Sequence, residues 1–190
     1  MKLLLYGLNY TPELTGIGKY TGEMAAWLAG RGHDVRVITA PPYYPDWKIG
    51  RGYTAWRYTQ ETVAGVTVYR CPLWVPAKPS GAARVAHLAS FAFSSLPVLL
   101  RQLSFKPDVL WTVAPAFFCA PAALAFSRLQ GCPCWLHVQD YELGAALAWG
   151  CSRENGSNTW PGLRRDCSCA DLITFHPYRN ACWKWPKAKA

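Results

Sequence analysis

The chain has 190 residues, of which 51% are hydrophobic and 16% are charged, and its formal net charge is +9. This length allows one domain, or one domain with a small extension, and the composition excludes a wholly disordered protein because it supplies enough apolar surface for a packed core. The apolar run after Lys2 is too short for a signal peptide, and no apolar stretch reaches the roughly 20 residues of a membrane-spanning helix. We therefore expect a cytoplasmic protein.

Two apolar runs with a helical segment between them open the chain. Residues 2–8 form a short run that is apolar after Lys2, which is typical of a strand buried on both faces, and residues 34–39 form a second expected strand. Residues 19–29 carry apolar side chains at helical spacing and are followed by Gly30 and Gly32, which end helices well. This order predicts a right-handed βαβ unit, the building block of a parallel sheet.

The same alternation continues as far as residue 138. The remaining expected strands are residues 66–71, 108–113 and 132–138, with a short strand near residues 56–60. The expected helices are residues 80–103, with a kink at Pro97, and residues 115–129, with Pro in the first turn. Five strands that alternate with helices predict an α/β fold with an open, mostly parallel, Rossmann-like sheet.

A loop with two glycines, residues 9–18, follows the first expected strand. Ligands bind at the carboxyl ends of the strands in open α/β sheets, and glycines let backbone N–H groups approach an anion closely. Thr21 stands where a dinucleotide fingerprint needs its third glycine, and Tyr20 stands where a P-loop needs Ser or Thr. We expect Gly16 and Gly18 to contact a substrate. The alternative is a turn that requires glycine at positive φ.

Polar side chains follow the fifth expected strand. His137, Asp140 and Glu142 lie at its carboxyl end, on the same sheet edge as the loop with the two glycines. A histidine and two carboxylates at this place are suited to hydroxyl recognition or to general base chemistry. The alternative is a solvated polar loop in which Asp140 is a capping residue.

An uncharged stretch of 16 residues runs from Val85 to Leu100 between Arg84 and Arg101. It is too short to span a bilayer. Two interpretations remain open for it: a helix packed on the sheet, or a helix at a membrane interface with its basic ends at the lipid headgroups.

The cysteines do not predict a metal site. Cys132 and Cys134, and likewise Cys167 and Cys169, are separated by one residue, whereas paired zinc ligands are usually separated by two to four. Cys132 and Cys134 are also expected on one face of a buried strand. We therefore expect no metal and no cofactor.

The periodic pattern ends close to Glu142. We expect residues 1–142 to form one domain and residues 143–190 to form a Cys- and Trp-rich, poorly ordered tail, although the segment from Ala170 to Thr174 is typical of a genuine strand. One hypothesis is that the tail is a frameshifted translation, because shifting residues 182–189 by one base allows an ordinary helical sequence. The alternative is a genuine short tail that carries cysteines.

Several strings of residues carry a resemblance to a known family. The strings run from Tyr6 to Glu23, Gly32 to Pro45, Arg70 to Leu73, Lys106 to Asp108, Phe118 to Pro121 and His137 to Glu142. On these strings, residues 1–142 resemble bacterial colanic-acid-type glycosyltransferases of the WcaI family. The resemblance implies a retaining GT-B glycosyltransferase, usually a fucosyltransferase of exopolysaccharide synthesis, in which two Rossmann-like domains face a cleft.

The resemblance also implies roles for the candidate residues. Gly16 and Gly18 would lie near the donor phosphates across the cleft, and His137 and Asp140 would line the acceptor side. The implied partners are a lipid-linked sugar acceptor and, where a donor domain is supplied, a nucleotide sugar such as a GDP-sugar. The lipid-linked acceptor favours peripheral contact with the inner membrane through the stretch from Val85 to Leu100. No catalytic residue is identified.

The implied function is therefore the N-terminal half of a glycosyltransferase, inactive on its own because the donor-binding domain is missing. A non-catalytic module that binds the acceptor or the membrane is the alternative. A nucleotide-dependent oxidoreductase is a third interpretation, against which the incomplete glycine fingerprint argues. The basic charge is compatible with anionic lipid, phosphorylated substrates or nucleic acid, but nucleic acid is not an expected partner.

Overall fold

A computed structural model describes residues 1–14, 16–78, 80–113, 117–137 and 173–175. The expectations for Asp140, for Glu142 and for most of residues 143–190 lie outside these residues. The division into two parts at residue 142 therefore stays a prediction, as does the frameshift hypothesis.

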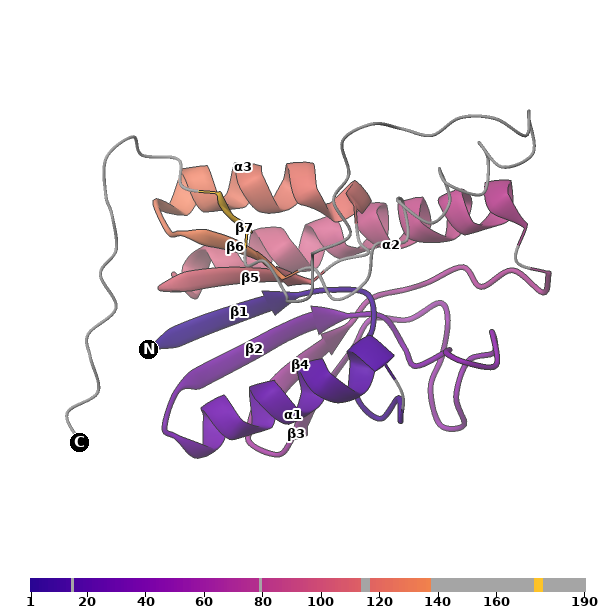
Figure 1. Cartoon of the computed structure of the whole chain (residues 1–190), viewed down its shortest axis with the longest axis horizontal. Coiled ribbons are helices and arrows are strands. Elements are labelled where there is room, and N and C mark those ends of the chain that lie inside the picture. Colours follow the sequence, from indigo (N-terminus) through magenta and orange to yellow (C-terminus); the bar gives the residue numbers. More distant parts are fainter. Residues whose placement is uncertain (15, 79, 114–116, 138–172, 176–190) are drawn as a thin grey trace, which may run out of the picture.

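Seven strands form one sheet in the order β3-β4-β2-β1-β5-β6-β7 (Figure 1). The strands are β1 Lys2–Tyr6, β2 Asp34–Thr39, β3 Thr59–Val63, β4 Val66–Arg70, β5 Val109–Val113, β6 Cys134–His137 and β7 Ile173–Phe175. The α-helices are α1 Gly16–Gly30, α2 Gly81–Arg101 and α3 Ala120–Gln130, and the 3-10 helices are η1 Gln102–Ser104 and η2 Phe117–Cys119.

The five inner strands β4, β2, β1, β5 and β6 are parallel to one another, whereas β3 and β7 are antiparallel to their neighbours at the two edges. This arrangement confirms the expected Rossmann-like α/β sheet. The strand expected from Ala170 to Thr174 overlaps β7, which pairs with β6.

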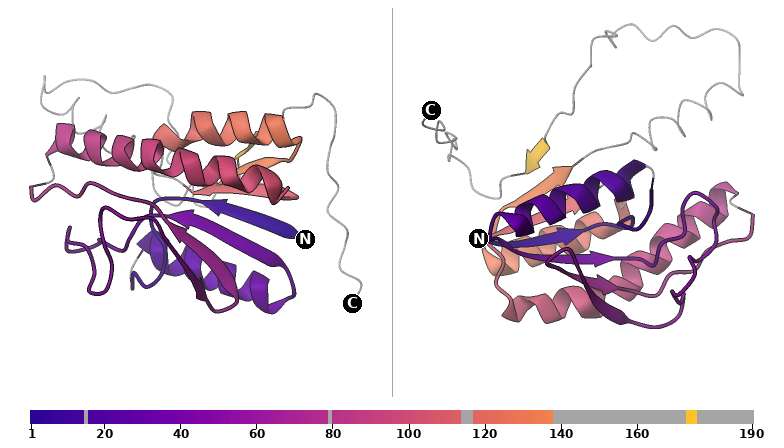
Figure 2. Two further views of the ribbon diagram at one scale, coloured as in Figure 1. Left: turned by 180° about the vertical axis from the view of Figure 1, so that it is seen from behind. Right: turned by 90° about the horizontal axis from the view of Figure 1, so that it is seen from below.

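Helix α1 covers one face of the sheet, and α2 and α3 cover the other (Figure 2). The side chains of β1 alternate between these two layers: Leu4 and Tyr6 belong to the core cluster beneath α2 and α3, whereas Leu3 and Leu5 belong to the cluster beneath α1. All four are buried. The continuous apolar run at the start of the chain is therefore a strand buried on both faces, as expected.

Some element boundaries differ from the expectation. α3 begins at Ala120, five residues later than expected and directly after η2, and the starts of β3 and α1 differ for local reasons. β3 begins at Thr59, three residues later than expected, because it forms a hairpin with β4 in which Ala64 and Gly65 are the turn residues, with φ of 50° and 79°. Two central residues at positive φ are typical of the turn that best fits the twist of a hairpin. α1 begins at Gly16, so both candidate glycines belong to its first turn and not to the loop before it.

Helix α2 is a single helix that continues through Pro97. Its first turn is capped by the hydroxyl of Ser80, which accepts a hydrogen bond from the backbone N–H of Ala83 at 3.4 Å. Such a cap satisfies one of the four N–H groups that a helix leaves without a partner at its start. The cap fixes where α2 begins, and with it the position of the helix turn that reaches the candidate site.

Candidate functional site

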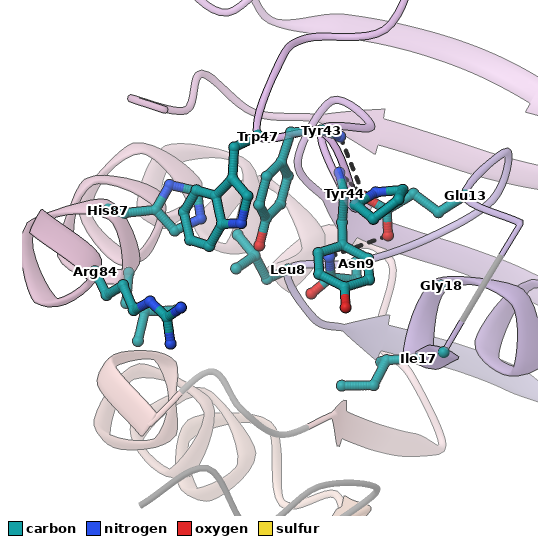
Figure 3. A pocket seen from close by; sticks show the side chains of 13 residues that line it. Leu8, Asn9, Glu13, Ile17, Gly18, Tyr43, Tyr44, Trp47, Arg84 and His87 are labelled. Atoms are coloured by element: carbon teal, nitrogen blue, oxygen red, sulfur yellow. Dashed lines mark hydrogen bonds between the residues drawn. The ribbon is translucent and has the colours of Figure 1, made fainter. Parts of the chain in front are cut away.

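A cavity of about 400 Å³ lies at the carboxyl ends of β1 and β2 (Figure 3). Four segments line it: the loop after β1, the first turn of α1, the loop after β2 and the first turns of α2. The lining residues are Leu8, Asn9, Glu13, Gly16, Ile17, Gly18, Tyr43, Tyr44, Pro45, Trp47, Arg84, His87 and Leu88. Its place matches the rule that ligands bind at the carboxyl edge of an open parallel sheet, and its volume is that of a small-molecule site.

Glu13 joins the two loops. Its side chain is 5% exposed, and its Oε1 accepts hydrogen bonds from the backbone N–H groups of Tyr43 and Tyr44, both at 3.2 Å. Its Oε2 accepts a hydrogen bond from Nδ2 of Asn9 at 3.0 Å. Burial raises the pKa of Glu13 above its ordinary value, and these hydrogen bonds and the charge of Arg70 oppose that shift only in part. The buried carboxyl group therefore forms the wall between the two loops.

Gly18 is needed because Glu13 lies against it. A Cβ at residue 18 would lie 2.5 Å from Oε2 and 2.8 Å from Cβ of Glu13, closer than such atoms approach. Gly16 has a φ of 60°, which side chains rarely adopt, so the turn alternative supplies a structural reason for this glycine. Both glycines line the cavity, and their contact with a substrate stays a prediction.

Arg70 connects the loop after β1 with the neighbouring strands. Its guanidinium group is almost fully buried and donates hydrogen bonds to the carbonyl oxygens of Ala40, at 2.9 Å, and Thr11, at 2.6 Å. Its Nε donates to Oε1 of Glu61 at 2.6 Å. One side chain thus connects the loop after β1, the end of β2 and strand β3. The rigid fork of donors on arginine is suited to such a set of acceptors.

His87 forms the inner wall of the cavity. Its Nδ1 lies 2.7 Å from the carbonyl oxygen of Trp74, and since a carbonyl only accepts, Nδ1 carries the proton. The ring is 1% exposed and packs 4.7 Å from the ring of Tyr43 and 5.2 Å from that of Trp47. Burial lowers the pKa of His87, which favours the neutral imidazole. Within the described part of the chain, Nε2 then remains as a buried acceptor without a hydrogen-bond partner.

His137 is not brought into this cavity. It lies at the end of β6, opposite Val113, with its ring 5.7 Å from that of Trp111. It is half-buried, and burial lowers its pKa. It shares the carboxyl edge of the sheet with Gly16 and Gly18, as expected, but it is not one of the lining residues, and Asp140 lies outside the described residues. A role for His137 and Asp140 in substrate binding stays a prediction.

The described cysteines are buried thiols. Cys71, Cys119, Cys132 and Cys134 are free, and burial raises the pKa of each, to about 12 for Cys71 and about 11 for Cys119. Metal ligation needs the thiolate, which these environments disfavour. Cys132 and Cys134 both lie in the core cluster beneath α2 and α3, as expected for one face of the sheet. Among the described residues, no group of three or more His, Cys, Asp or Glu side chains could hold a metal ion.

Three residues that line the cavity were not predicted as site residues from the sequence: Glu13, Arg84 and His87. Glu13 is the one charged side chain between Asn9 and Gly18, and His87 is the one histidine in the uncharged stretch after Arg84. A lone ionisable group in an otherwise neutral segment was the signal available. This signal does not identify the contacts of each group, because those contacts are made with loops or turns that are distant in the sequence.

Replacing Glu13 by glutamine is expected to remove a pH dependence of stability. The folded-state pKa of Glu13 is raised, so its contribution to stability is fully present below the unfolded value near 4.5 and is lost as the pH rises through the folded pKa. Glutamine keeps an oxygen for the two backbone N–H groups but does not titrate. The free energy of unfolding, measured by urea denaturation, should therefore favour the wild type over Glu13→Gln more at pH 4.5 than at pH 7.5. A difference between the two proteins that is the same at both pH values would contradict this, and Glu23→Gln, at an exposed glutamate of α1, is the control substitution.

Comparison with known proteins agrees with the resemblance of the sequence strings. The profile of the Glycosyl transferase 4-like domain matches residues 15–175, and thus extends past Glu142. WcaI of Escherichia coli strain K12, provisionally described as a colanic acid biosynthesis glycosyl transferase, is 57% identical over 150 residues, which are 79% of this chain and 37% of that protein. The chain thus spans well under half of the length of this relative. The matches in sequence and the Rossmann-like sheet agree, and the chain belongs to the glycosyl transferase 4-like domain family.

Proposed function

We propose that this chain is the acceptor-binding part of a glycosyltransferase of colanic-acid-type exopolysaccharide synthesis. The reaction is transfer of a sugar, of the fucosyl type, from a GDP-sugar to a lipid-linked sugar at the cytoplasmic side of the inner membrane. The observation that carries the proposal is the cavity at the carboxyl edge of β1 and β2, because it is built from the two loops that carry the family strings. The similarity to WcaI of Escherichia coli supports the choice of pathway.

The chain of 190 residues is proposed to be inactive by itself. Transfer from a nucleotide sugar requires stabilisation of the charge that develops on the departing diphosphate. Arg84 is the one cationic side chain among the described residues that line the cavity, and it lies at the start of α2. Binding of an acceptor alone supplies no such stabilisation. The groups that stabilise the departing diphosphate therefore have to be supplied by a further domain or chain.

A transfer assay tests this directly. The purified 190-residue chain is incubated with a GDP-sugar and a lipid-linked sugar, and products are followed by mass spectrometry. We expect no product above a blank without protein. Turnover of the GDP-sugar by this chain alone would refute the proposal that the chain is inactive by itself.

Peripheral membrane contact is proposed for the outer face of α2. One face of α2 packs within the fold, where His87, Phe91, Ser95, Val98 and Leu99 are buried. The opposite stripe is apolar and exposed: the exposed fractions are 53% for Val85, 74% for Phe93, 36% for Leu96 and 58% for Leu100. A helix with one buried face and one exposed apolar stripe between two arginines is suited to lie in an interface.

The length of this helix agrees with the expected residues 80–103, but the expectation that no segment could span a membrane does not hold by length and composition. The segment Gly81–Ser104, which includes η1, has 24 residues and a mean hydropathy of 1.4 in its most apolar window, so by length and composition alone it is one described helix able to cross a membrane. One third of that window is buried within the fold, so one face of the helix contacts the sheet and most of the window is not buried. The contacts of α2 with the sheet therefore favour interfacial contact over spanning.

Replacing Phe93 and Leu100 together by serine is expected to weaken binding to phospholipid vesicles by tenfold or more. Each apolar side chain contributes roughly 1.5–3 kcal/mol when it is fully removed from water. Co-sedimentation with vesicles that contain anionic lipid measures the partition coefficient. The matched control is Trp27→Ser, which removes a side chain that is 56% exposed on α1, on the opposite face of the sheet. Equal binding by the double variant and the control would exclude α2 as the contact surface.

A further inference from the structure

Arg84 lines the cavity and forms no ion pair with any of the described residues. It is exposed, and its guanidinium carbon lies 5.6 Å from the centre of the Trp47 ring. Within the described part of the chain, the ion pairs are Lys19 with Glu23 and Arg70 with Glu61, and neither includes Arg84. An unpaired guanidinium beside a cavity is suited to bind a phosphate group, because its donors match phosphate geometry.

Trp47 provides an aromatic surface next to this cation. Its backbone has a φ of 52°, an uncommon conformation for a residue other than glycine. Its ring is held from within by the rings of Tyr43, at 5.6 Å, and His87, at 5.2 Å, and Figure 3 shows it beside His87 and above Arg84. Uncommon backbone conformations persist where the surroundings enforce them, and they cluster at ligand sites. The C–H face of a pyranose ring is an apolar surface that packs on such an indole.

Hydrogen-bonding groups line the other side of the cavity. Nδ2 of Asn9 donates to Glu13, which leaves Oδ1 of Asn9 as an acceptor. The two oxygens of Glu13 already receive three hydrogen bonds and still have acceptor capacity. Such acceptors are suited to sugar hydroxyl groups. A cavity with an aromatic wall, a few convergent polar groups and one cation thus has the composition of a site for a phosphorylated sugar.

We propose that this cavity binds a glycosyl phosphate, with the pyranose ring packed on Trp47, its hydroxyl groups bonded to Asn9 and Glu13, and its phosphate paired with Arg84. The inference rests on the proposed function in one respect, since it takes this unit to be the first sugar and phosphate of the lipid-linked acceptor. The ring of His87 packs against that of Trp47 at 5.2 Å and supports it from within.

Calorimetry with the full 190-residue chain tests the site. The probes are galactose 1-phosphate and glucose 1-phosphate, compared with the free hexoses and with inorganic phosphate. We expect at least one hexose 1-phosphate to bind saturably and about tenfold or more tightly than its free hexose, because its phosphate adds charge-assisted hydrogen bonds with Arg84. Inorganic phosphate that binds as tightly as both hexose 1-phosphates would overturn the proposal, since it would indicate a simple anion site. Absence of saturable binding by both sugars would overturn it as well.

Two variants assign the contacts. Arg84→Gln is expected to abolish the preference for the phosphorylated sugar, whereas Arg57→Gln, at an exposed arginine outside the cavity, is expected to leave it unchanged. Trp47→Leu is expected to weaken binding of the sugar with and without phosphate by about tenfold. Thermal unfolding of each variant verifies that it is folded. Unchanged affinity in folded Arg84→Gln would exclude the proposed phosphate contact.

The outcomes also separate this inference from the proposed function. If the chain binds a hexose 1-phosphate but no enzyme that contains it transfers a sugar, the ligand assigned to the cavity is retained. The proposed glycosyltransferase function is then rejected. If an active enzyme that contains this chain shows the same KM for the acceptor with Arg84→Gln and with Trp47→Leu as without them, the glycosyltransferase function is retained. The cavity is then rejected as its acceptor subsite.

Discussion

Replacing Arg70 by methionine lowers the free energy of unfolding by about 3–5 kcal/mol, because two backbone carbonyl oxygens lose their donor, at about 1–3 kcal/mol each, and a partly exposed ion pair is lost as well. Methionine retains much of the apolar volume but leaves the carbonyl oxygens of Thr11 and Ala40 without their donors and Glu61 without its counter-charge. Buried polar groups that lose a partner bear the desolvation cost in full. The loss is large because three segments share this one side chain.

Urea denaturation followed by circular dichroism measures the effect. Glu61→Gln is the informative comparison, since the side chain of Glu61 is 31% exposed and water replaces part of its bond to Arg70. We expect Glu61→Gln to cost clearly less than Arg70→Met, and the exposed control Arg57→Met to be close to neutral. A free energy of unfolding for Arg70→Met within 1 kcal/mol of the wild type would show that this network does not hold the strand ends.

Replacing Gly18 by alanine is the second large effect, with an expected destabilisation of about 2–4 kcal/mol. The new methyl group would lie 2.8 Å from Cβ of Glu13, so the whole side chain has to move, not only its flexible end. Overpacking of this kind costs about 1–3 kcal/mol. Displacing Glu13 also removes the acceptor of the backbone N–H groups of Tyr43 and Tyr44. The loop after β2 should therefore loosen as well.

Gly30→Ala is the matched control in the same helix. No atom lies within 4 Å of a Cβ added at Gly30, and alanine is favoured over glycine in a helix by about 0.8–1.0 kcal/mol. Thermal unfolding should place Gly18→Ala below the wild type and Gly30→Ala at or above it. Hydrogen exchange of the amides of Tyr43 and Tyr44 should accelerate in Gly18→Ala alone. Equal stability of the two variants would contradict the close packing of Gly18 on Glu13.

The sheet was predictable because its information is local. Continuous apolar runs such as the one after Lys2 occur where helices cover both faces, and the structure places Leu4 and Leu5 in opposite layers accordingly. The start of β3 was less predictable. It depends on the tight turn at Ala64 and Gly65, and an alanine at positive φ gives little signal in a sequence.

The site was predictable only in its position. The place of the loop after the first strand indicated a ligand region, and Gly16 and Gly18 do line the cavity. Residue 18 has to be glycine because Glu13 packs against it. The carboxyl group of Glu13 is held in turn by a backbone N–H group 30 residues further along the chain. The place of His87 in the site was not predictable for the same reason, since its partners Trp74 and Tyr43 come from other segments. Contacts between distant residues, and not local patterns, decide the chemistry of this cavity.

Sugar transfer by a chimera is the most direct test of the central claim, that this chain is the acceptor-binding part of a glycosyltransferase. In WcaI of Escherichia coli K12, the segment that matches this chain at 57% identity is replaced by the corresponding 150 residues of this chain. The account predicts transfer from a GDP-sugar to a lipid-linked sugar by the folded chimera, loss of that transfer in the chimera with Gly18→Ala, and no transfer by the 190-residue chain alone. A folded chimera without transfer, under conditions in which WcaI itself is active, would contradict it.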